Sequence, residues 1–204
     1  MGIEVETDEV IGLEYDGIYH VITRNNKFSS KTLIIATGAN RKTPNIKGVK
    51  EFEGKGVSYC AVCDAFFYKD KDVGVLGGGD YALQEARHLL PIAKSVSILT
   101  NGKELVENRS INYDDFYIHK KEIEEISGED KISKIKFKDG TSLKTEGLFI
   151  AIGIATSTDL ARKLGAVVNN NNIVVDTNMK TNVPRSICMW RLYRRITTNF
   201  KSSI

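Results

Sequence analysis

Long apolar runs are absent from this sequence of 204 residues, and proline is scarce. The longest apolar stretches, such as residues 147–152, fall well short of the roughly 20 residues that a membrane-spanning helix needs, so we expect no membrane span and no membrane partner. Only three prolines in a chain that is 41% apolar exclude a fibrous or disordered protein. The first six residues include acids where a secretory signal is basic and then apolar. We therefore expect a cytoplasmic protein with a packed core.

Acidic residues are missing from residues 185–204, which hold five of the 29 lysines and arginines. The rest of the chain has 29 minus 5, or 24, basic residues against 26 acidic ones, a balance of −2 in a chain whose net charge is +3. The positive charge therefore belongs to this tail alone. Because the body has no excess of positive charge, we expect no nucleic-acid partner.

Cysteine and histidine are also few, with three of each. Cys60 and Cys63 stand three residues apart, which is typical either of half a zinc site or of a dithiol that cycles between reduced and oxidised forms. A tetrahedral zinc site needs two more ligands, and only Cys188 and three scattered histidines remain. We therefore favour a redox-active dithiol and expect no metal site. Asp64 follows directly and is a candidate for moving the accompanying proton, or simply a turn residue or helix cap.

The middle of the chain contains a strand, a glycine turn and a helix. Residues 73–76 predict a strand, residues 81–90 a helix that Pro91 ends, and residues 95–99 a second strand, which together form a βαβ unit. Gly77, Gly79 and Ala82 fit the G-x-G-x-x-A fingerprint of dinucleotide-binding loops. Residues 100–103 contain neither an acid for a ribose hydroxyl nor an arginine for a 2′-phosphate. The sequence thus predicts the fold and leaves NADPH binding open.

A meander and an apolar strand are predicted on each side of this βαβ unit. Residues 10–30 alternate in polarity around an Asp16–Gly17 turn, and residues 117–144 show the same pattern, so we expect an antiparallel meander in each. Residues 31–36 form an apolar run that predicts a fully buried strand ending in small residues, and residues 147–152 repeat that design. The chain is therefore expected to leave one domain and return to it.

These elements resemble the bacterial low-molecular-weight thioredoxin reductases, in order and in spacing, across about residues 10–184. The resemblance implies an α/β flavoprotein disulfide reductase fold of two nested domains, with a Rossmann-like βαβ domain inserted in an incomplete FAD domain. It implies FAD as cofactor and thioredoxin as partner, with a homodimer as the family's assembly. Cys60 would attack thioredoxin, Cys63 would face the flavin, and Asp64 would be the acid. The matching elements are residues 33–39, 58–68, 77–82, 149–153 and 176–184, and Ala36, Thr37, Gly38 and Ala39 would lie against the FAD.

The same resemblance sets the domain boundaries and singles out departures from the family. We expect residues 1–50 to be a remnant of the FAD-binding domain, 51–153 the central dinucleotide-binding and redox-disulfide domain, and 154–184 the return to the FAD domain. The glycine loop that opens the family's FAD domain is missing, so we expect a chain truncated at its N-terminus. The family's NADPH-binding histidine and arginines are also missing, which is similar to the clostridial branch that takes electrons from ferredoxin.

The tail, residues 185–204, departs most from the sequence of the family. After residues 181–184 the family continues with a Gly-Asp pair that binds the flavin, and residues 185–204 lack it. Codons that can encode this tail contain the missing pair when they are read one nucleotide later, so we expect a frameshift near Pro184 and an out-of-frame tail. The sequence therefore supports a flavin-dependent thioredoxin-disulfide reductase. The alternative is an inactive fragment whose central domain folds and binds a nucleotide or a protein without catalysis.

Overall fold

A computed structural model describes residues 4–37, 43–106, 112–169, 172–188 and 193–195. The chain divides into two compact units. The first comprises residues 1–12, 23–25 and 42–155, and the second comprises residues 13–22, 26–41 and 156–204. The chain thus leaves the second unit and returns to it. The boundaries expected at residues 50, 153 and 184 stay predictions.

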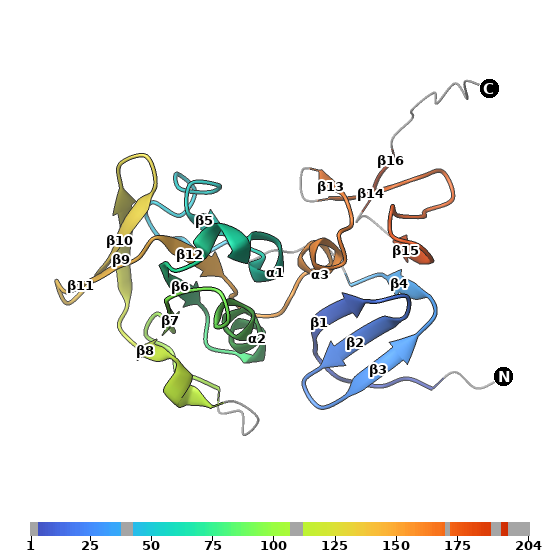
Figure 1. Cartoon of the computed structure of the whole chain (residues 1–204), viewed down its shortest axis with the longest axis horizontal. Coiled ribbons are helices and arrows are strands. Elements are labelled where there is room, and N and C mark those ends of the chain that lie inside the picture. The colour runs from blue at the N-terminus through green and yellow to red at the C-terminus, as the bar shows by residue number, and fades with distance from the viewer. Residues whose placement is uncertain (1–3, 38–42, 107–111, 170–171, 189–192, 196–204) are drawn as a thin grey trace. The chain divides into compact units, whose positions relative to one another are not determined.

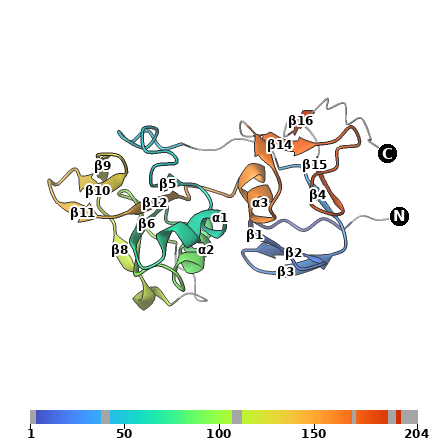
Figure 2. The same ribbon diagram turned by 45° about the horizontal axis from the view of Figure 1, so that its top comes forward.

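A five-stranded parallel sheet forms the centre of the first unit (Figure 1). The predicted βαβ unit is confirmed, because β6 and β7 pair in parallel and α2 connects them. α1 and α2 lie side by side in two views of the ribbon (Figure 1; Figure 2), and α2 packs on β6 and β7. In sheet order the strands are β5 (Val57–Ser58), β12 (Gly147–Ile150), β6 (Asp72–Leu76), β7 (Ser95–Leu99) and β8 (Tyr117–His119), and the helices are α1 (Ala61–Asp64), the 3-10 turn η1 (Ala65–Tyr68), α2 (Asp80–Leu89) and the 3-10 turn η2 (Tyr113–Asp115).

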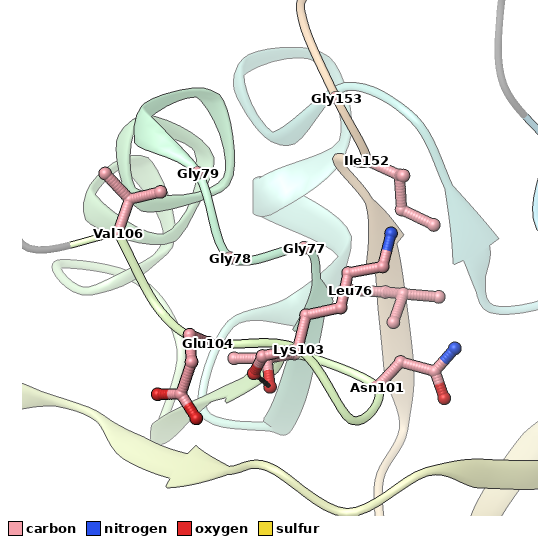
Figure 3. Close-up of a pocket in the computed structure, with 11 residues that line it drawn as sticks. Leu76, Gly77, Gly78, Gly79, Asn101, Lys103, Glu104, Val106, Ile152 and Gly153 are labelled. Atoms are coloured by element: carbon pink, nitrogen blue, oxygen red, sulfur yellow. Dashed lines mark hydrogen bonds between the residues drawn. The ribbon is translucent and has the colours of Figure 1, made fainter.

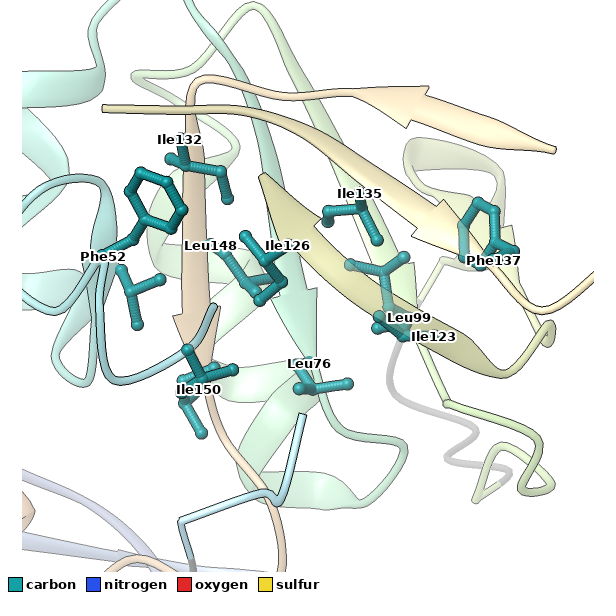
Figure 4. Close-up of a cluster of buried hydrophobic side chains, with 12 residues drawn as sticks. Phe52, Leu76, Leu99, Ile123, Ile126, Ile132, Ile135, Phe137, Leu148 and Ile150 are labelled. Carbon is teal, nitrogen blue, oxygen red and sulfur yellow. The ribbon is translucent and has the colours of Figure 1, made fainter. Parts of the chain in front are cut away.

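An antiparallel meander covers the parallel sheet with a shared apolar core (Figure 4). Its strands are β9 (Ile123–Gly128), β10 (Ile132–Phe137) and β11 (Ser142–Lys144). The register of β10 on β9 shifts just after Ile132, so Ile132 and Ile135 both face the core although they are three residues apart. The core also takes Leu76, Leu99 and Leu148 from the parallel strands.

The expectation for residues 117–120 was wrong. They form β8, which pairs in parallel with β7 and extends the central sheet instead of joining the meander. The third strand of the meander is β9, which was not predicted from the sequence. Its inward residues Ile123 and Ile126 are three apart, so the strict alternation that indicates a strand is broken.

The second unit contains most of the N-terminal sheet β1-β2-β3, the three-stranded sheet β13-β14-β16 and a pair of parallel strands, β4 and β15. Gly17 makes the predicted turn between β1 and β2 with a φ of +108°. β4 pairs only with β15 among the described residues, and Ile34 is 60% exposed, so the prediction of a fully buried strand here was wrong. The bounds are β1 (Val10–Tyr15), β2 (Tyr19–Thr23), β3 (Lys27–Ser30), β4 (Leu33–Ile35), α3 (Ser157–Lys163), β13 (Val168–Asn169), β14 (Asn172–Val175), β15 (Ser186–Cys188) and β16 (Tyr193–Arg195).

Parts of the tail expected to be out of frame do form strands, since β15 pairs with β4 and β16 pairs with β14. Strand pairing uses backbone groups, which every residue except proline supplies in full. The pairing therefore fits either reading of the gene, and the frameshift stays a prediction. Within the described residues, none of the helices combines the length and the apolar character that crossing a bilayer requires.

Candidate functional site

The sharpest sequence signal, Cys60 and Cys63, becomes a disulfide at the start of α1. Cys60 is the N-cap of this one-turn helix, and its Sγ accepts a hydrogen bond from the backbone N–H of Cys63 at 3.2 Å. Such a donor stabilises a thiolate once the disulfide is reduced. The two sulfurs differ in accessibility, because Cys60 is only 3% exposed whereas Cys63 is exposed. An incoming reductant therefore meets Cys63 first.

Asp64 lies at the end of α1 and connects to the dithiol through Ser58. The hydroxyl of Ser58 donates to Oδ2 of Asp64 at 2.6 Å and accepts from the backbone N–H of Cys60 at 3.2 Å. This chain of two hydrogen bonds fixes the carboxylate near the first turn of α1. The role of Asp64 in moving a proton stays a prediction.

Tyr68 anchors the segment that follows the dithiol. Its ring packs edge-on against Phe149 with 5.1 Å between ring centroids. A Cβ on Gly147 would lie 2.3 Å from the Tyr68 ring, so only glycine permits this close approach of the sheet. Burial and the negative charge of Asp64 raise the pKa of the Tyr68 hydroxyl. Tyr68 therefore stays neutral and holds η1 onto the sheet.

Three apolar side chains beside the dithiol point to solvent instead of the core. Phe66 is 79% exposed, Phe67 is 69% exposed and Val62 is 47% exposed. Exposed aromatic residues that gather beside a reactive group are typical of protein-binding surfaces. The family resemblance covers this segment, residues 58–68, but implies no role for these three residues. The sequence did carry a signal for this surface, namely the two adjacent phenylalanines that follow the cysteine motif. Two neighbouring side chains in a short turn cannot both be buried.

The glycine turn between β6 and α2 has the geometry that the fingerprint requires. Gly77 has a φ of +153°, and a Cβ there would lie 2.1 Å from the carbonyl oxygen of Ala151 and 2.8 Å from Cβ of Ala82. Gly77 and the buried Ala82 thus let β6, α2 and the end of β12 pack closely. Gly79 is the N-cap of α2, and a Cβ there would meet nothing within 4 Å. The N-terminus of α2 is the positive end of the helix dipole, which favours an anionic group there.

A pocket of about 220 Å³ lies beside the glycine turn (Figure 3). This is less than the roughly 300–1,000 Å³ typical of small-molecule sites. Among its described lining residues Lys103 is the only cation, and the carboxylate of Glu104 is paired with Lys120 at 2.7 Å. The loop after β7 also closes onto the turn, because the N–H of Val106 donates to the carbonyl oxygen of Gly78 at 2.7 Å. The turn fits a pyrophosphate, and the described lining residues offer one cation, Lys103, to a 2′-phosphate.

The residues expected to face a flavin are only partly described. Ala36 and Thr37 are exposed at the end of β4, as small residues that a flat ring could approach. The hydroxyl of Thr37 is hydrogen-bonded to that of Ser157, the first residue of α3. Gly38 and Ala39 lie outside the described residues. The exposed Ala36 and Thr37 therefore fit a flat cofactor, and the assignment of all four residues to FAD stays a prediction.

Metal-ligating side chains do not gather at this site. In the parts of the chain that the structure describes, no group of three or more histidine, cysteine, aspartate or glutamate side chains has an arrangement that could hold a metal ion. The two sulfurs of Cys60 and Cys63 are bonded to each other. These two sulfurs supply one reaction, the making and breaking of that disulfide.

The chain is similar in sequence and in structure to known flavoprotein reductases. The model of the pyridine nucleotide-disulphide oxidoreductase family matches residues 1–185. A thioredoxin reductase from Peptoclostridium acidaminophilum is 34% identical over 200 residues, covering 89% of this chain and 64% of that protein. The crystal structure of an atypical thioredoxin reductase from Desulfovibrio vulgaris Hildenborough matches with a TM-score of 0.81 and 34% identity, covering 90% of this chain and 64% of that one.

A ferredoxin-flavin thioredoxin reductase from Clostridium acetobutylicum is also similar, with a TM-score of 0.54 and 29% identity. The match covers 91% of this chain and 63% of that chain. The chain therefore spans slightly less than two thirds of the length of these relatives. The predicted α/β fold of the flavoprotein disulfide reductases is confirmed by these matches.

Proposed function

Because the chain belongs to the pyridine nucleotide-disulphide oxidoreductase family, we propose that its Cys60–Cys63 pair transfers an electron pair to the disulfide of a thioredoxin. The observation that carries this proposal is the disulfide at the start of α1, with one exposed sulfur and an exposed aromatic pair beside it. The thioredoxin reductases that resemble this chain support the choice of partner. As in the family, FAD supplies the electron pair when it is bound.

The reaction on the protein side is a thiol–disulfide exchange in two steps. In the reduced chain the Cys60 thiolate attacks one sulfur of the partner disulfide, which forms a mixed disulfide and releases one partner thiolate. The Cys63 thiolate then attacks Sγ of Cys60, which releases the second partner thiol and reforms the Cys60–Cys63 disulfide. Two electrons and two protons pass to the partner. Cys60 is proposed as the attacking group because the Cys63 N–H donates to its sulfur. Cys60 is only 3% exposed in the oxidised chain, so its attack requires that its sulfur become accessible once the bond to Cys63 has opened.

The proposed docking surface comprises Val62, Phe66 and Phe67. These side chains flank the dithiol and remain exposed, so a partner that covers them gains apolar contact at the point of exchange. Replacing Phe66 and Phe67 together by alanine is expected to raise the thioredoxin concentration needed for half-maximal rate. Phe28→Ala is the matched control, because Phe28 is an exposed phenylalanine on β3. An equal increase of this thioredoxin concentration in the double variant and in the control would contradict the docking role.

A single-turnover experiment tests the exchange without a cofactor. The chain is reduced with dithiothreitol, freed of reductant and mixed with oxidised thioredoxin, and free thiols on each protein are counted by alkylation and mass spectrometry. One thioredoxin disulfide should be reduced for each chain. Cys60→Ser and Cys63→Ser should each abolish complete transfer, whereas Cys188→Ser should not change it. A wild-type chain that keeps its two thiols in the presence of oxidised thioredoxin would favour the inactive-fragment alternative.

For the electron donor, we propose a ferredoxin-type protein in place of NADPH. Three observations support this: the small pocket, the presence of Lys103 as the single cation among the lining residues that the structure describes, and the loop bonded to Gly78. The chain reconstituted with FAD should be reduced by photoreduced ferredoxin, read as bleaching of the flavin band, and should respond little to NADPH. Rapid bleaching by NADPH at micromolar concentration would exclude this donor assignment and leave the thiol exchange intact.

A further inference from the structure

Glu85 is an acidic side chain buried beneath the dithiol helix. It lies on α2, is only 1% exposed, and its Oε2 accepts a hydrogen bond from the backbone N–H of Ala61 at 2.8 Å. Ala61 is itself fully buried and is the first residue of α1. Acidic side chains are rarely buried to this extent, because removing them from water is costly unless a specific partner compensates. The contact therefore joins the helix of the nucleotide fold to the helix that carries the cysteines.

Local hydrogen bonds cannot by themselves hold α1 in place. The helix has four residues, and one turn of helix is unstable in isolation. The backbone N–H groups at its start depend on side chains: that of Cys60 donates to Ser58, that of Cys63 donates to Sγ of Cys60, and that of Ala61 donates to Glu85. Ser58 and Cys60 belong to the same short segment as α1. Of these three acceptors, Ser58 ends β5 only two residues before Cys60, whereas Glu85 lies on α2, 24 residues along the chain from Ala61.

We propose that Glu85 is a positioning residue that keeps the two cysteines at bonding distance after the disulfide opens. In the oxidised chain the S–S bond itself fixes the separation of Cys60 and Cys63. In the reduced chain that link is gone, and the anchor at Ala61 limits how far the first turn moves. Two reacting groups held in place behave as if their concentration were high. Glu85 therefore favours ring closure by the dithiol, and this inference rests on the proposed function.

Equilibrium with glutathione measures this effect directly. The disulfide and two glutathione molecules exchange with the dithiol and one glutathione disulfide, and the equilibrium constant gives the effective concentration of the two thiols. Glu85→Leu removes the acceptor and should lower that concentration by about tenfold, so that the disulfide is easier to reduce. Glu85→Gln keeps an acceptor oxygen and should stay within about twofold of wild type. Gln84→Leu, on the same helix, is the control and should leave it unchanged.

The outcomes separate the positioning role from the proposed function. A folded Glu85→Leu chain with the wild-type constant overturns the positioning role and leaves the exchange reaction standing, as does a Glu85→Gln chain that shifts as far as the leucine variant. A wild-type pair that no thiol reductant opens overturns both. Amide hydrogen exchange on the unmutated chain needs no variant to fold: the N–H of Ala61 should stay protected after reduction, and loss of that protection overturns the proposal.

Discussion

The reduced chain carries three thiols, and iodoacetamide should separate them at pH 8. Cys188 is fully buried in β15, and burial raises the pKa of its thiol to about 11. At pH 8 its thiolate fraction is then about one in a thousand, whereas a cysteine of unperturbed pKa near 8.5 is about one quarter ionised. Because the thiolate is the reacting form, Cys188 starts with a disadvantage of about 250-fold.

A weaker acid is a better nucleophile once it is ionised, and this offsets part of the difference. With a Brønsted slope of about 0.45, a pKa increase of about 2.5 units raises the intrinsic reactivity of the thiolate about tenfold. The loss of ionisation is larger than this gain. Cys188 should therefore be alkylated about 20-fold more slowly than an exposed cysteine, even before its burial hinders the reagent.

Intact-mass measurement after timed quenching provides the assay. The exposed Cys63 should be alkylated quickly on the reduced native chain and Cys188 slowly, with a Cys188 rate that rises about tenfold for each pH unit below the pKa. Cys188→Ser should take up only two adducts, and the wild-type chain in concentrated urea should take up three at similar rates. Three adducts at equal rates on the native chain would refute the reasoning. A slow Cys188 rate that does not change with pH would also refute it.

The other predictions concern the roles of the two cysteines, the glycine turn and the tail. A Cys63→Ser chain should form a covalent adduct through Cys60 with a single-cysteine thioredoxin activated by thionitrobenzoate, and faster adduct formation by a Cys60→Ser chain would reverse the assigned roles. Gly77→Ala should lower the free energy of unfolding by about 2–4 kcal/mol, because its Cβ would lie 2.1 Å from a carbonyl oxygen. Gly79→Ala should change it by less than about 1 kcal/mol, and equal urea midpoints for the two variants would contradict this difference. A one-base change in the gene near Pro184 should restore the Gly-Asp pair, and the chain made from the restored frame should bind FAD more tightly; a gene in which no such change restores the pair excludes the frameshift.

The sequence predicted the central fold well because its signals are local. The glycine turn between two apolar runs has few alternatives to a βαβ unit, and residues 95–99 form the strand as expected. The helix α3 was missed, although Thr156 and Asp159 form a capping box that the sequence displays. β8 was assigned to the wrong sheet, because its choice of partner depends on β7, a strand about 20 residues away in the chain.

The candidate site was predictable only where side chains carry the signal. Cys60 and Cys63 are recognisable from spacing alone, whereas the contact between Val106 and Gly78 uses backbone atoms that no side chain reveals. The burial of Glu85 could also have been predicted from its position in the sequence. This residue lies three residues after Ala82 and four before Leu89, so the period of the helix places it on the buried face with them.

The loop after β7 closes on the glycine turn, so any nucleotide that binds there competes with the hydrogen bond from Val106 to Gly78. A dinucleotide that uses this turn needs the bond from Val106 to Gly78 to open, and a net cost of about 0.5–1.5 kcal/mol leaves roughly one molecule in 3 to 14 ready to bind. Apparent affinity falls by the same factor for every ligand of that turn. A shortened or glycine-rich loop should remove this penalty. The affinity of the turn for a ligand therefore depends partly on the fraction of molecules in which the loop is open.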